Sequence, residues 1–265
     1  MLIIAERINA SRRGIRPAIE NRDTGLIQEE VRRQAAAGAA YIDLNAGTLP
    51  ADQEIGGLCW LVETSQAVCD LPLCLDSPNP DALAAAAALC LRPPLINSIT
   101  LEPQRFDGIL PLLAESAMPV IALCQDEGRM AVTTKDKIEL AERLVAQLGA
   151  AGIGSERIYI DPLAYPLATD SASAVAALDA ISDIMVRFAG VHTVCGLTNV
   201  SYGLPARRLV NRTFLVAAIC RGLDAVICDP TDGELIQALH AARLVAGRDA
   251  FCMDFIQAFK EGRLG

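Results

Sequence analysis

Eight short apolar runs divide this chain at fairly regular intervals, and each ends in a carboxylate or carboxamide side chain. The runs are Leu2–Asn9, Tyr41–Asn45, Leu73–Asp76, Leu95–Asn97, Val120–Asp126, Ile158–Asp161, Val194–Asn199 and Ala225–Asp229. A parallel strand that is buried on both faces reads as a near-continuous apolar run. When eight such strands close into a barrel, their carboxyl ends meet at one mouth. The pattern therefore predicts a mouth lined by Asp, Asn and Gln, with almost no fixed positive charge.

A stretch with helical periodicity follows each run. The expected helices are Gly25–Gly38, Asp52–Val68, Pro80–Leu91, Phe106–Ser116, Thr134–Ala151, Ala172–Phe188, Leu209–Arg221 and Asp232–Val245, with a closing helix at Asp254–Glu261. This alternation is typical of a (β/α)8 TIM barrel, which needs about 250 residues, so we expect one domain over residues 1–265. A doubly wound open sheet is the rival fold, but the first strand is not followed by its glycine-rich G-x-G-x-x-G turn.

Charge and hydropathy limit the partners of this chain. Its net charge of −9 argues against nucleic acid and anionic membranes, which select basic surfaces. The longest apolar stretch, Ala82–Leu91, has ten residues, whereas a membrane-spanning helix needs roughly 20. Met1 leads directly into a strand, without the charged segment that opens a secretory signal. We therefore expect a cytoplasmic protein.

Several residue types are missing from the places where they would support other chemistry. No Lys lies on a predicted strand, which disfavours a Schiff-base mechanism. His192 precedes the seventh strand, away from the mouth, and His240 lies in the last predicted barrel helix, so neither is placed as a general base. The nine cysteines form no C-x-x-C pair, which argues against disulfides and zinc and favours buried thiols.

Two readings of the strand endings remain. Carboxylates at a barrel mouth can hold Mg²⁺ or Mn²⁺, which favour oxygen ligands. Here, however, carboxylates alternate with amides, at Asp76, Asn97, Asp161 and Asn199. An amide pairs a donor with an acceptor, which suits the edge of a flat heterocycle rich in N–H and C=O groups. The alternation therefore favours a heterocyclic ligand and no bound metal.

A set of short motifs, taken in order, resembles one known family. The motifs are Glu6-Arg7-Ile8-Asn9, Asp43-Leu44-Asn45-Ala46-Gly47, Leu75-Asp76-Ser77, Ile96-Asn97-Ser98, Tyr159-Ile160-Asp161-Pro162-Leu163, Gly196-Leu197-Thr198-Asn199-Val200-Ser201, Asn211-Arg212-Thr213-Phe214-Leu215 and Gly222-Leu223-Asp224-Ala225. The set is similar to the methyltetrahydrofolate:corrinoid protein methyltransferases. These are pterin-binding barrels related to dihydropteroate synthase and to the folate module of cobalamin-dependent methionine synthase. The resemblance extends from Leu2 to the tail.

The resemblance implies a pterin held by Asp76, Asn97 and Asp161, which in that family hydrogen-bond the aminopyrimidinone edge and the ring nitrogens. Asn199 matches an amide that swings toward N5 when the folate binds. The residues that would complete the pocket are Asp43, Asn45, Gly196 and Arg207. One departure is Tyr202, which stands where a polar residue is common, in a loop that faces the corrinoid.

Methyl transfer from a tertiary amine explains why such residues are needed. N5 leaves as an amide-like anion unless it is protonated, so the enzyme must help to place a proton there. A carboxamide has no proton to give at neutral pH, but the oxygen of Asn199 can accept a hydrogen bond from protonated N5. The proton would come from solvent or through a network that involves Asp161. We therefore expect Asn199 and Asp161 to be the catalytic residues.

The partners follow from the resemblance and from one absence. Methyltetrahydrofolate or tetrahydrofolate is the implied small substrate. The sequence has no corrinoid-binding D-x-H-x-x-G motif, so the cobalamin must arrive on a separate corrinoid protein. A homodimer is expected from the resemblance alone.

Other assignments stay open at this stage. Asp43 either contacts the ligand directly or supports the residues that contact it. Glu6 and Arg7 are expected to form a structural ion pair beneath the site, and Asp229 has no assigned role. The arginines of the first loop, Arg12, Arg13 and Arg16, either bind the glutamate tail of the folate or belong to a solvated loop, which we prefer.

Three other functions compete with methyl transfer. A dihydropteroate synthase would need cations for diphosphate, whereas the eighth strand ends in the acidic segment Cys228–Asp232. A metal-dependent lyase would use the carboxylates. A folate carrier would bind the substrate without catalysis.

Overall fold

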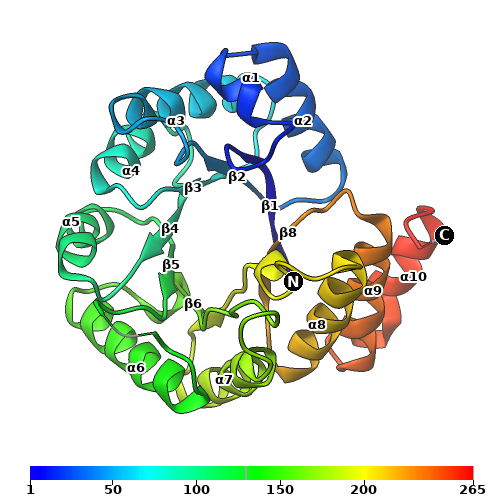
Figure 1. Cartoon of the computed structure of the whole chain (residues 1–265). Coiled ribbons are helices and arrows are strands. Elements are labelled where there is room, and N and C mark those ends of the chain that lie inside the picture. Colours follow the sequence, from blue (N-terminus) through cyan, green and yellow to red (C-terminus); the bar gives the residue numbers. More distant parts are fainter. Residues whose placement is uncertain (129, 265) are drawn as a thin grey trace.

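Eight parallel strands form one sheet that rolls into a barrel, seen end-on in Figure 1. The computed structural model describes residues 1–128 and 130–264. The strands are β1 Leu2–Asn9, β2 Tyr41–Asn45, β3 Leu73–Asp76, β4 Leu95–Ile99, β5 Val120–Leu123, β6 Ile158–Asp161, β7 His192–Thr193 and β8 Ala225–Cys228. Their hydrogen-bonded order is β7-β6-β5-β4-β3-β2-β1-β8, so chain neighbours from β1 to β7 are also sheet neighbours and β8 pairs with β1. The prediction of a (β/α)8 barrel is confirmed.

Helices surround the strands as an outer ring (Figure 1). They are α1 Arg16–Glu20, α2 Thr24–Ala36, α3 Ala51–Gln66, α4 Pro80–Ala87, α5 Pro103–Ala114, α6 Thr134–Ala150, α7 Ser173–Arg187, α8 Arg207–Arg221, α9 Gly233–Val245 and α10 Met253–Lys260, with short 3₁₀ turns at η1 Ser155–Arg157, η2 Leu197–Asn199 and η3 Ala250–Cys252. All nine expected helices are present within a few residues, whereas α1 was not predicted. Within the described ranges, no helix is both long and apolar enough to cross a membrane.

Two apolar layers hold the barrel together. Buried residues of the helices pack on the outer face of the strands, as Ile27 and Val31 of α2 do. A separate buried cluster includes Ile4, Leu95 and Ile121, on three different strands. The buried cysteines Cys74, Cys124, Cys195 and Cys228 are free thiols, as the sequence predicted.

The strand register brings the polar endings to one level. The parallel ladders pair Asn9 with Asn45, Asn45 with Asp76, and Asp76 with Asn97. Adjacent strands lie about 4.8 Å apart, so these four polar side chains stand in a row on the neighbouring strands β1 to β4. Asp161 ends β6, opposite Leu123 of β5.

The seventh strand differs from its prediction. Residues 194–199 were expected as a strand, but regular pairing covers only His192 and Thr193. The segment then bends into η2, and the barrel closes through a bond from Ile227 N–H to Cys195 O of 2.9 Å and an isolated bridge between Gly196 and Ile227. The apolar run was long enough for a strand, but the 3₁₀ turn uses residues 197–199 to carry Asn199 over the mouth.

Candidate active site

The row of endings is joined by side-chain hydrogen bonds. Asn45 Nδ2 donates to Asp76 Oδ2 at 2.8 Å. Asn97 Nδ2 lies 3.5 Å from Asp43 Oδ1, at the long limit for such a bond. Asp43 is two residues before Asn45 on β2 and therefore faces the same side of the strand. Asp43, Asn45, Asp76 and Asn97 thus form one polar cluster on three adjacent strands.

This polar cluster concentrates carboxylate groups in a buried place. Asp43 is 1% exposed. Burial raises the pKa of Asp43 well above its usual range, and the nearby Asp76 carboxylate raises it further. Burial also raises the pKa of Asp76, but less, because the hydrogen bond from Asn45 and the charge of Arg105 oppose the effect. Asp43 is therefore the member that holds a proton most readily.

Asp161 belongs to the opposite side of the mouth and is 6% exposed. Its Oδ1 accepts a hydrogen bond from Leu163 N–H at 2.7 Å, and its Oδ2 accepts one from Gly196 N–H at 3.4 Å. Burial raises the pKa of Asp161 to about 6, although these two backbone donors and Lys137 work against the shift. Asp161 is thus ionised at neutral pH and connects β6 to the segment that carries Asn199.

Asn199 is exposed at the end of η2. Among the hydrogen bonds of the described residues, its side chain has none, so the amide is free to turn. A Cβ atom placed on Gly196 would lie 3.2 Å from Asn199 Nδ2. Glycine at position 196 therefore leaves room for the Asn199 amide, which a larger side chain would crowd.

Arg207 begins α8 above the same turn. Its Nη2 donates to Thr198 O at 2.8 Å and its Nε to Ser201 Oγ at 3.1 Å. Its guanidinium lies 5.8 Å from the centre of the Tyr202 ring. Arg207 therefore fixes the loop after Asn199.

The remaining endings stabilise loops. Asn9 Oδ1 accepts from Ser11 N–H at 2.9 Å, and Gln125 Nε2 donates to Glu102 Oε1 at 2.8 Å. Asp229 accepts from the N–H and the hydroxyl of Thr231. These three residues therefore hold the loops of the mouth by hydrogen bonds.

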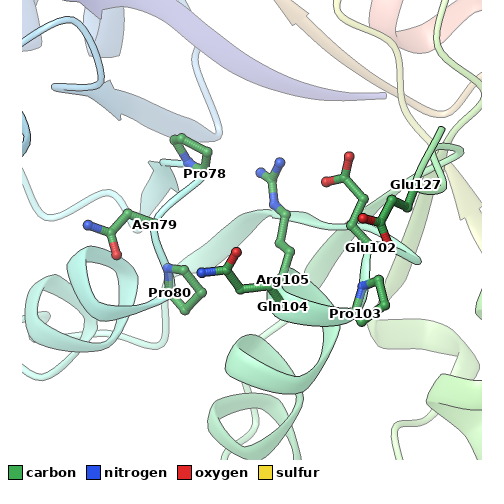
Figure 2. Close-up of a pocket in the computed structure, with 8 residues that line it drawn as sticks. All are labelled: Pro78, Asn79, Pro80, Glu102, Pro103, Gln104, Arg105 and Glu127. Carbon is green, nitrogen blue, oxygen red and sulfur yellow. The ribbon is translucent and has the colours of Figure 1, made fainter.

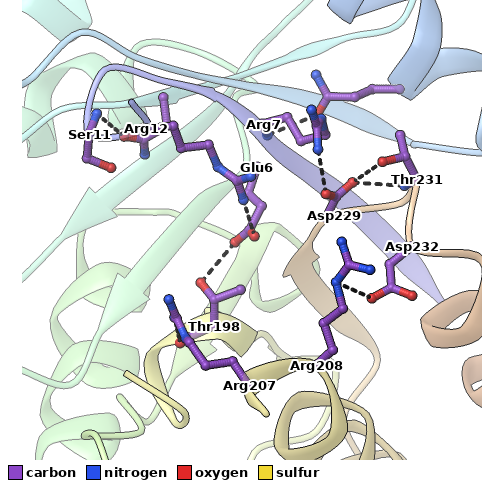
Figure 3. A network of polar contacts seen from close by, with 12 residues as sticks. Glu6, Arg7, Ser11, Arg12, Thr198, Arg207, Arg208, Asp229, Thr231 and Asp232 are labelled. Atoms are coloured by element: carbon purple, nitrogen blue, oxygen red, sulfur yellow. Dashed lines mark hydrogen bonds and ion pairs between the residues drawn. The ribbon is translucent and has the colours of Figure 1, made fainter. Parts of the chain in front are cut away.

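A charged network includes Thr198, the residue before Asn199 (Figure 3). Glu6 accepts from Arg12 at 2.6 Å and from Thr198 Oγ1 at 3.2 Å. Arg7 binds Glu30 and, at 2.8 Å, Asp229. The predicted ion pair between Glu6 and Arg7 is therefore wrong, because each side chain is paired with another residue, Glu6 with Arg12 and Arg7 with Glu30 and Asp229.

The prediction of a mouth without fixed positive charge is also wrong. A cavity of about 760 Å³ contains Asn199 in its wall and is lined by four guanidinium groups. These belong to Arg7, Arg12, Arg207 and Arg208. Arg7 lies inside β1, Arg12 lies in the loop after it, and Arg207 and Arg208 begin α8, so none of them is at a strand ending. Of the first-loop arginines, Arg12 is paired with Glu6 and Arg16 with Glu20, while Arg13 is exposed.

Comparison with known proteins agrees with this geometry. The family model described as "Pterin binding enzyme" matches residues 6–229. The chain belongs to the pterin-binding enzymes.

One relative of this pterin-binding enzyme matches over its full length. It is the methylcorrinoid:tetrahydrofolate methyltransferase of Eubacterium limosum, 34% identical, with 100% of this chain and 98% of that protein covered. The resemblance to the methyltetrahydrofolate:corrinoid methyltransferases is thereby confirmed. Methionine synthase of Mycobacterium tuberculosis is 31% identical over 86% of this chain, but the match spans 20% of that longer protein. Dihydropteroate synthase from Xanthomonas albilineans shares the fold, with a TM-score of 0.72, 19% identity, and 92% of each chain covered.

Arg105 of this pterin-binding enzyme was not predicted as a site residue. It lies in the wall of a cavity of about 670 Å³ (Figure 2). Its guanidinium donates to Ser98 O at 2.8 Å, to Ser98 Oγ at 3.0 Å and to Ser77 O at 3.3 Å. Ser77 and Ser98 directly follow Asp76 and Asn97, so Arg105 joins the ends of β3 and β4. No sequence signal marked it, because it lies in a helix rather than at a strand end.

We expect Arg105→Met to weaken both the fold and the site. Loss of these hydrogen bonds should lower the free energy of unfolding by roughly 1–3 kcal/mol in urea denaturation. The Asp76 carboxyl loses a nearby cation, so tetrahydrofolate binding at pH 7 should weaken as well. Arg157→Met is a matched control, because Arg157 also donates to carbonyl oxygens, of Leu113 and Met118, but precedes β6 at the other end of the barrel. Equal folate affinity in both variants would contradict a role for Arg105 at the mouth.

The histidines and candidate metal ligands lie as follows. His192 begins β7 at the end opposite the mouth, where its Nδ1 lies 2.6 Å from Asp224 Oδ2. His240 lies in α9. In the part of the chain that the structure describes, no group of three or more His, Cys, Asp or Glu side chains is placed to hold a metal ion.

Proposed function

We propose that this methyltransferase moves a methyl group between N5 of methyltetrahydrofolate and the cobalt of a corrinoid protein. The full-length match to a methylcorrinoid:tetrahydrofolate methyltransferase carries this proposal. The cluster of carboxylates and amides at the mouth supports it, since such groups complement a pterin edge.

In the proposed complex, Asp76, Asn97 and Asp161 hold the pterin. Carboxylates accept from N–H groups of the ring, and the amide of Asn97 both donates and accepts. Asp43 and Asn45 hold Asn97 and Asp76 by the hydrogen bonds described above. Because these side chains stand on four strands of a rigid barrel, the ring is oriented before the reaction begins.

Asn199 serves N5 in this proposal. During transfer to cobalt, the bond between the methyl carbon and N5 breaks, a carbon–cobalt bond forms, and a proton neutralises the nitrogen. The turning amide of Asn199 places its oxygen to accept a hydrogen bond from protonated N5. Once turned toward N5, the amide dipole stabilises the charge that develops on the nitrogen, which is an effective source of catalysis. Asp161 accepts a hydrogen bond from Gly196 N–H, three residues before Asn199. In this proposal, the proton reaches N5 from solvent or through a network that includes the Asp161 carboxylate.

The corrinoid is the second substrate and arrives on its own protein. The cavity lined by Asn199, Tyr202 and Arg207 opens beside N5 in this arrangement and is the proposed entry for the cobalt-bearing ring. A cytoplasmic location and a homodimer stay predictions.

The decisive test mixes protein, methyltetrahydrofolate and chemically reduced cobalamin and follows the cobalt absorption spectrum. Methylcobalamin should form in proportion to enzyme, and the reverse mixture, methylcobalamin with tetrahydrofolate, should return methyltetrahydrofolate. Added chelator should leave the rate unchanged, whereas a metal-dependent lyase would lose activity. Folate binding without any methylcobalamin would instead support the carrier function and reject our proposal.

A further inference from the structure

Lys137 is a fully buried lysine close to the mouth, and no step above uses it. It lies in the first turn of α6 and is 0% exposed. Burying an ammonium group is costly unless every hydrogen finds an acceptor. Because burial of this ammonium group is costly, we expect Lys137 to do more than pack α6 against the barrel.

The ammonium of Lys137 is saturated by backbone carbonyl groups. Its Nζ donates to Ala131 O at 2.7 Å, Pro162 O at 2.9 Å and Leu163 O at 2.7 Å. A lysine ammonium has three hydrogens, so all are used. The ring of Tyr165 adds a cation–π contact, with Nζ 4.9 Å from its centre. Lys137 is therefore a bound cation and not a nucleophile.

Two of these acceptors directly follow Asp161. Leu163 adopts a positive φ of 57°, in the left-handed region, and its N–H donates to Asp161 Oδ1 at 2.7 Å. The loop is also held from its other side, where Ser173 Oγ donates to Tyr165 O and accepts from Tyr165 N–H. Lys137 therefore holds the peptide whose N–H orients Asp161.

We propose that Lys137 is a positioning residue for Asp161. Its ammonium fixes the backbone of residues 162–163, so that Leu163 N–H stays on Asp161 Oδ1 and Oδ2 stays directed toward Gly196. Its charge also favours the ionised carboxylate that a pterin edge needs. The importance of Asp161 for binding rests on the proposed function, but the effect of Lys137 on Asp161 does not.

The surrounding charges agree with this role. The Lys137 charge counteracts the burial that raises the pKa of Asp161. Burial lowers the pKa of Lys137, while the Asp161 carboxylate opposes that shift. Burial also raises the pKa values of the neighbouring thiols Cys124 and Cys195, which keeps them neutral at neutral pH. The interaction between Lys137 and Asp161 is therefore not masked by a thiolate.

The test measures the titration of the Asp161 carboxyl group directly, by ¹³C NMR of the ligand-free full chain, with Asp161→Asn to assign the signal. In Lys137→Met, proton binding by Asp161 should tighten about tenfold, since a nearby cation typically shifts a carboxylate by that much or more. Lys137→Arg should restore most of the parental value. Leu144→Ala is the matched control, a buried change in the same helix that should lower stability and leave the titration unchanged.

A second measurement links the effect to binding. Tetrahydrofolate affinity should fall in Lys137→Met by about twofold at pH 7 and about tenfold at pH 5, because affinity follows the ionised fraction of Asp161. This loss should vanish when Asp161→Asn is already present, because coupled residues are not additive. Should Lys137→Met fail to fold, Lys137→Gln keeps two donor hydrogens without the charge and serves both experiments. A folded Lys137→Met or Lys137→Gln protein with the parental Asp161 titration would overturn the proposal. Absence of folate binding in the parent would reject the proposed function and leave the NMR test intact.

Discussion

Asn199→Ala is expected to abolish most methyl transfer and to keep most of the folate affinity. The amide of Asn199 has no hydrogen bond in the described structure, so its removal leaves no partner unsatisfied and little stability is lost. What disappears is a dipole aimed at protonated N5, and removing one such group typically costs about 100- to 1,000-fold in rate. The measurement is the single-turnover rate of methylcobalamin formation, with tetrahydrofolate binding followed separately by calorimetry.

Two companion results make the prediction for Asn199 specific. Asn199→Asp keeps an acceptor oxygen at the same place and should retain more activity than Asn199→Ala. Gly196→Ala leaves Asn199 in the chain but crowds its amide, so its rate should also fall. An Asn199→Ala protein that transfers methyl groups at the parental rate would refute the role of this amide.

Asp161→Ala is expected to abolish detectable folate binding at micromolar protein. Two backbone donors, Leu163 N–H and Gly196 N–H, lose their acceptor, and the pterin loses a carboxylate. Removal of one partner from a buried, charged hydrogen-bond group costs roughly 2–5 kcal/mol, or about 30- to 5,000-fold in affinity. Calorimetric titration with tetrahydrofolate measures the effect, and circular dichroism checks that the barrel is still folded.

The pH dependence of binding provides an independent check on Asp161. Because burial raises the pKa of Asp161 to about 6, folate affinity should fall below pH 6, by roughly tenfold per pH unit. For folding the sign is opposite. The folded state holds this proton more tightly than the unfolded state, so the contribution of Asp161 to stability is lost as the pH rises from about 4 to 6. Asp161→Asn should flatten both profiles, and an unchanged binding profile in that variant would assign the titration to another group.

The endings of the strands were predictable because two simple signals coincide there. A buried parallel strand is largely apolar, so the polar residue that closes the run marks both its end and the mouth, as at Asp76 and Asp161. The ends of β1, β2, β3 and β6 agree with the structure to the residue. The cluster of Asp43, Asn45, Asp76 and Asn97 then follows from parallel pairing in register.

The cations of the site could not be predicted in this way. Lys137 and Arg105 lie near the starts of α6 and α5, where a charged residue ordinarily faces solvent. Only the three-dimensional closure of the barrel brings their side chains onto the carbonyl groups that follow Asp161 and Asp76. Glu6 and Arg7 show the same limit, because adjacency in the sequence suggested a pair, whereas their partners Arg12, Glu30 and Asp229 are brought close by the fold.

Because β7 is short, the contact that closes the barrel, between the chain after β7 and β8, has few backbone hydrogen bonds. We call this contact the seam. Between β1 and β8 four residue pairs are in register, whereas the chain after β7 meets β8 through one bond at Cys195 and a bridge at Gly196. Asn199 follows this seam by three residues. Since local opening costs least where backbone hydrogen bonds are few, we expect this seam to open more readily than the contact between β1 and β8. In the proposed reaction, such opening would let the amide of Asn199 follow N5 while the strands that carry Asp76 and Asn97 stay still.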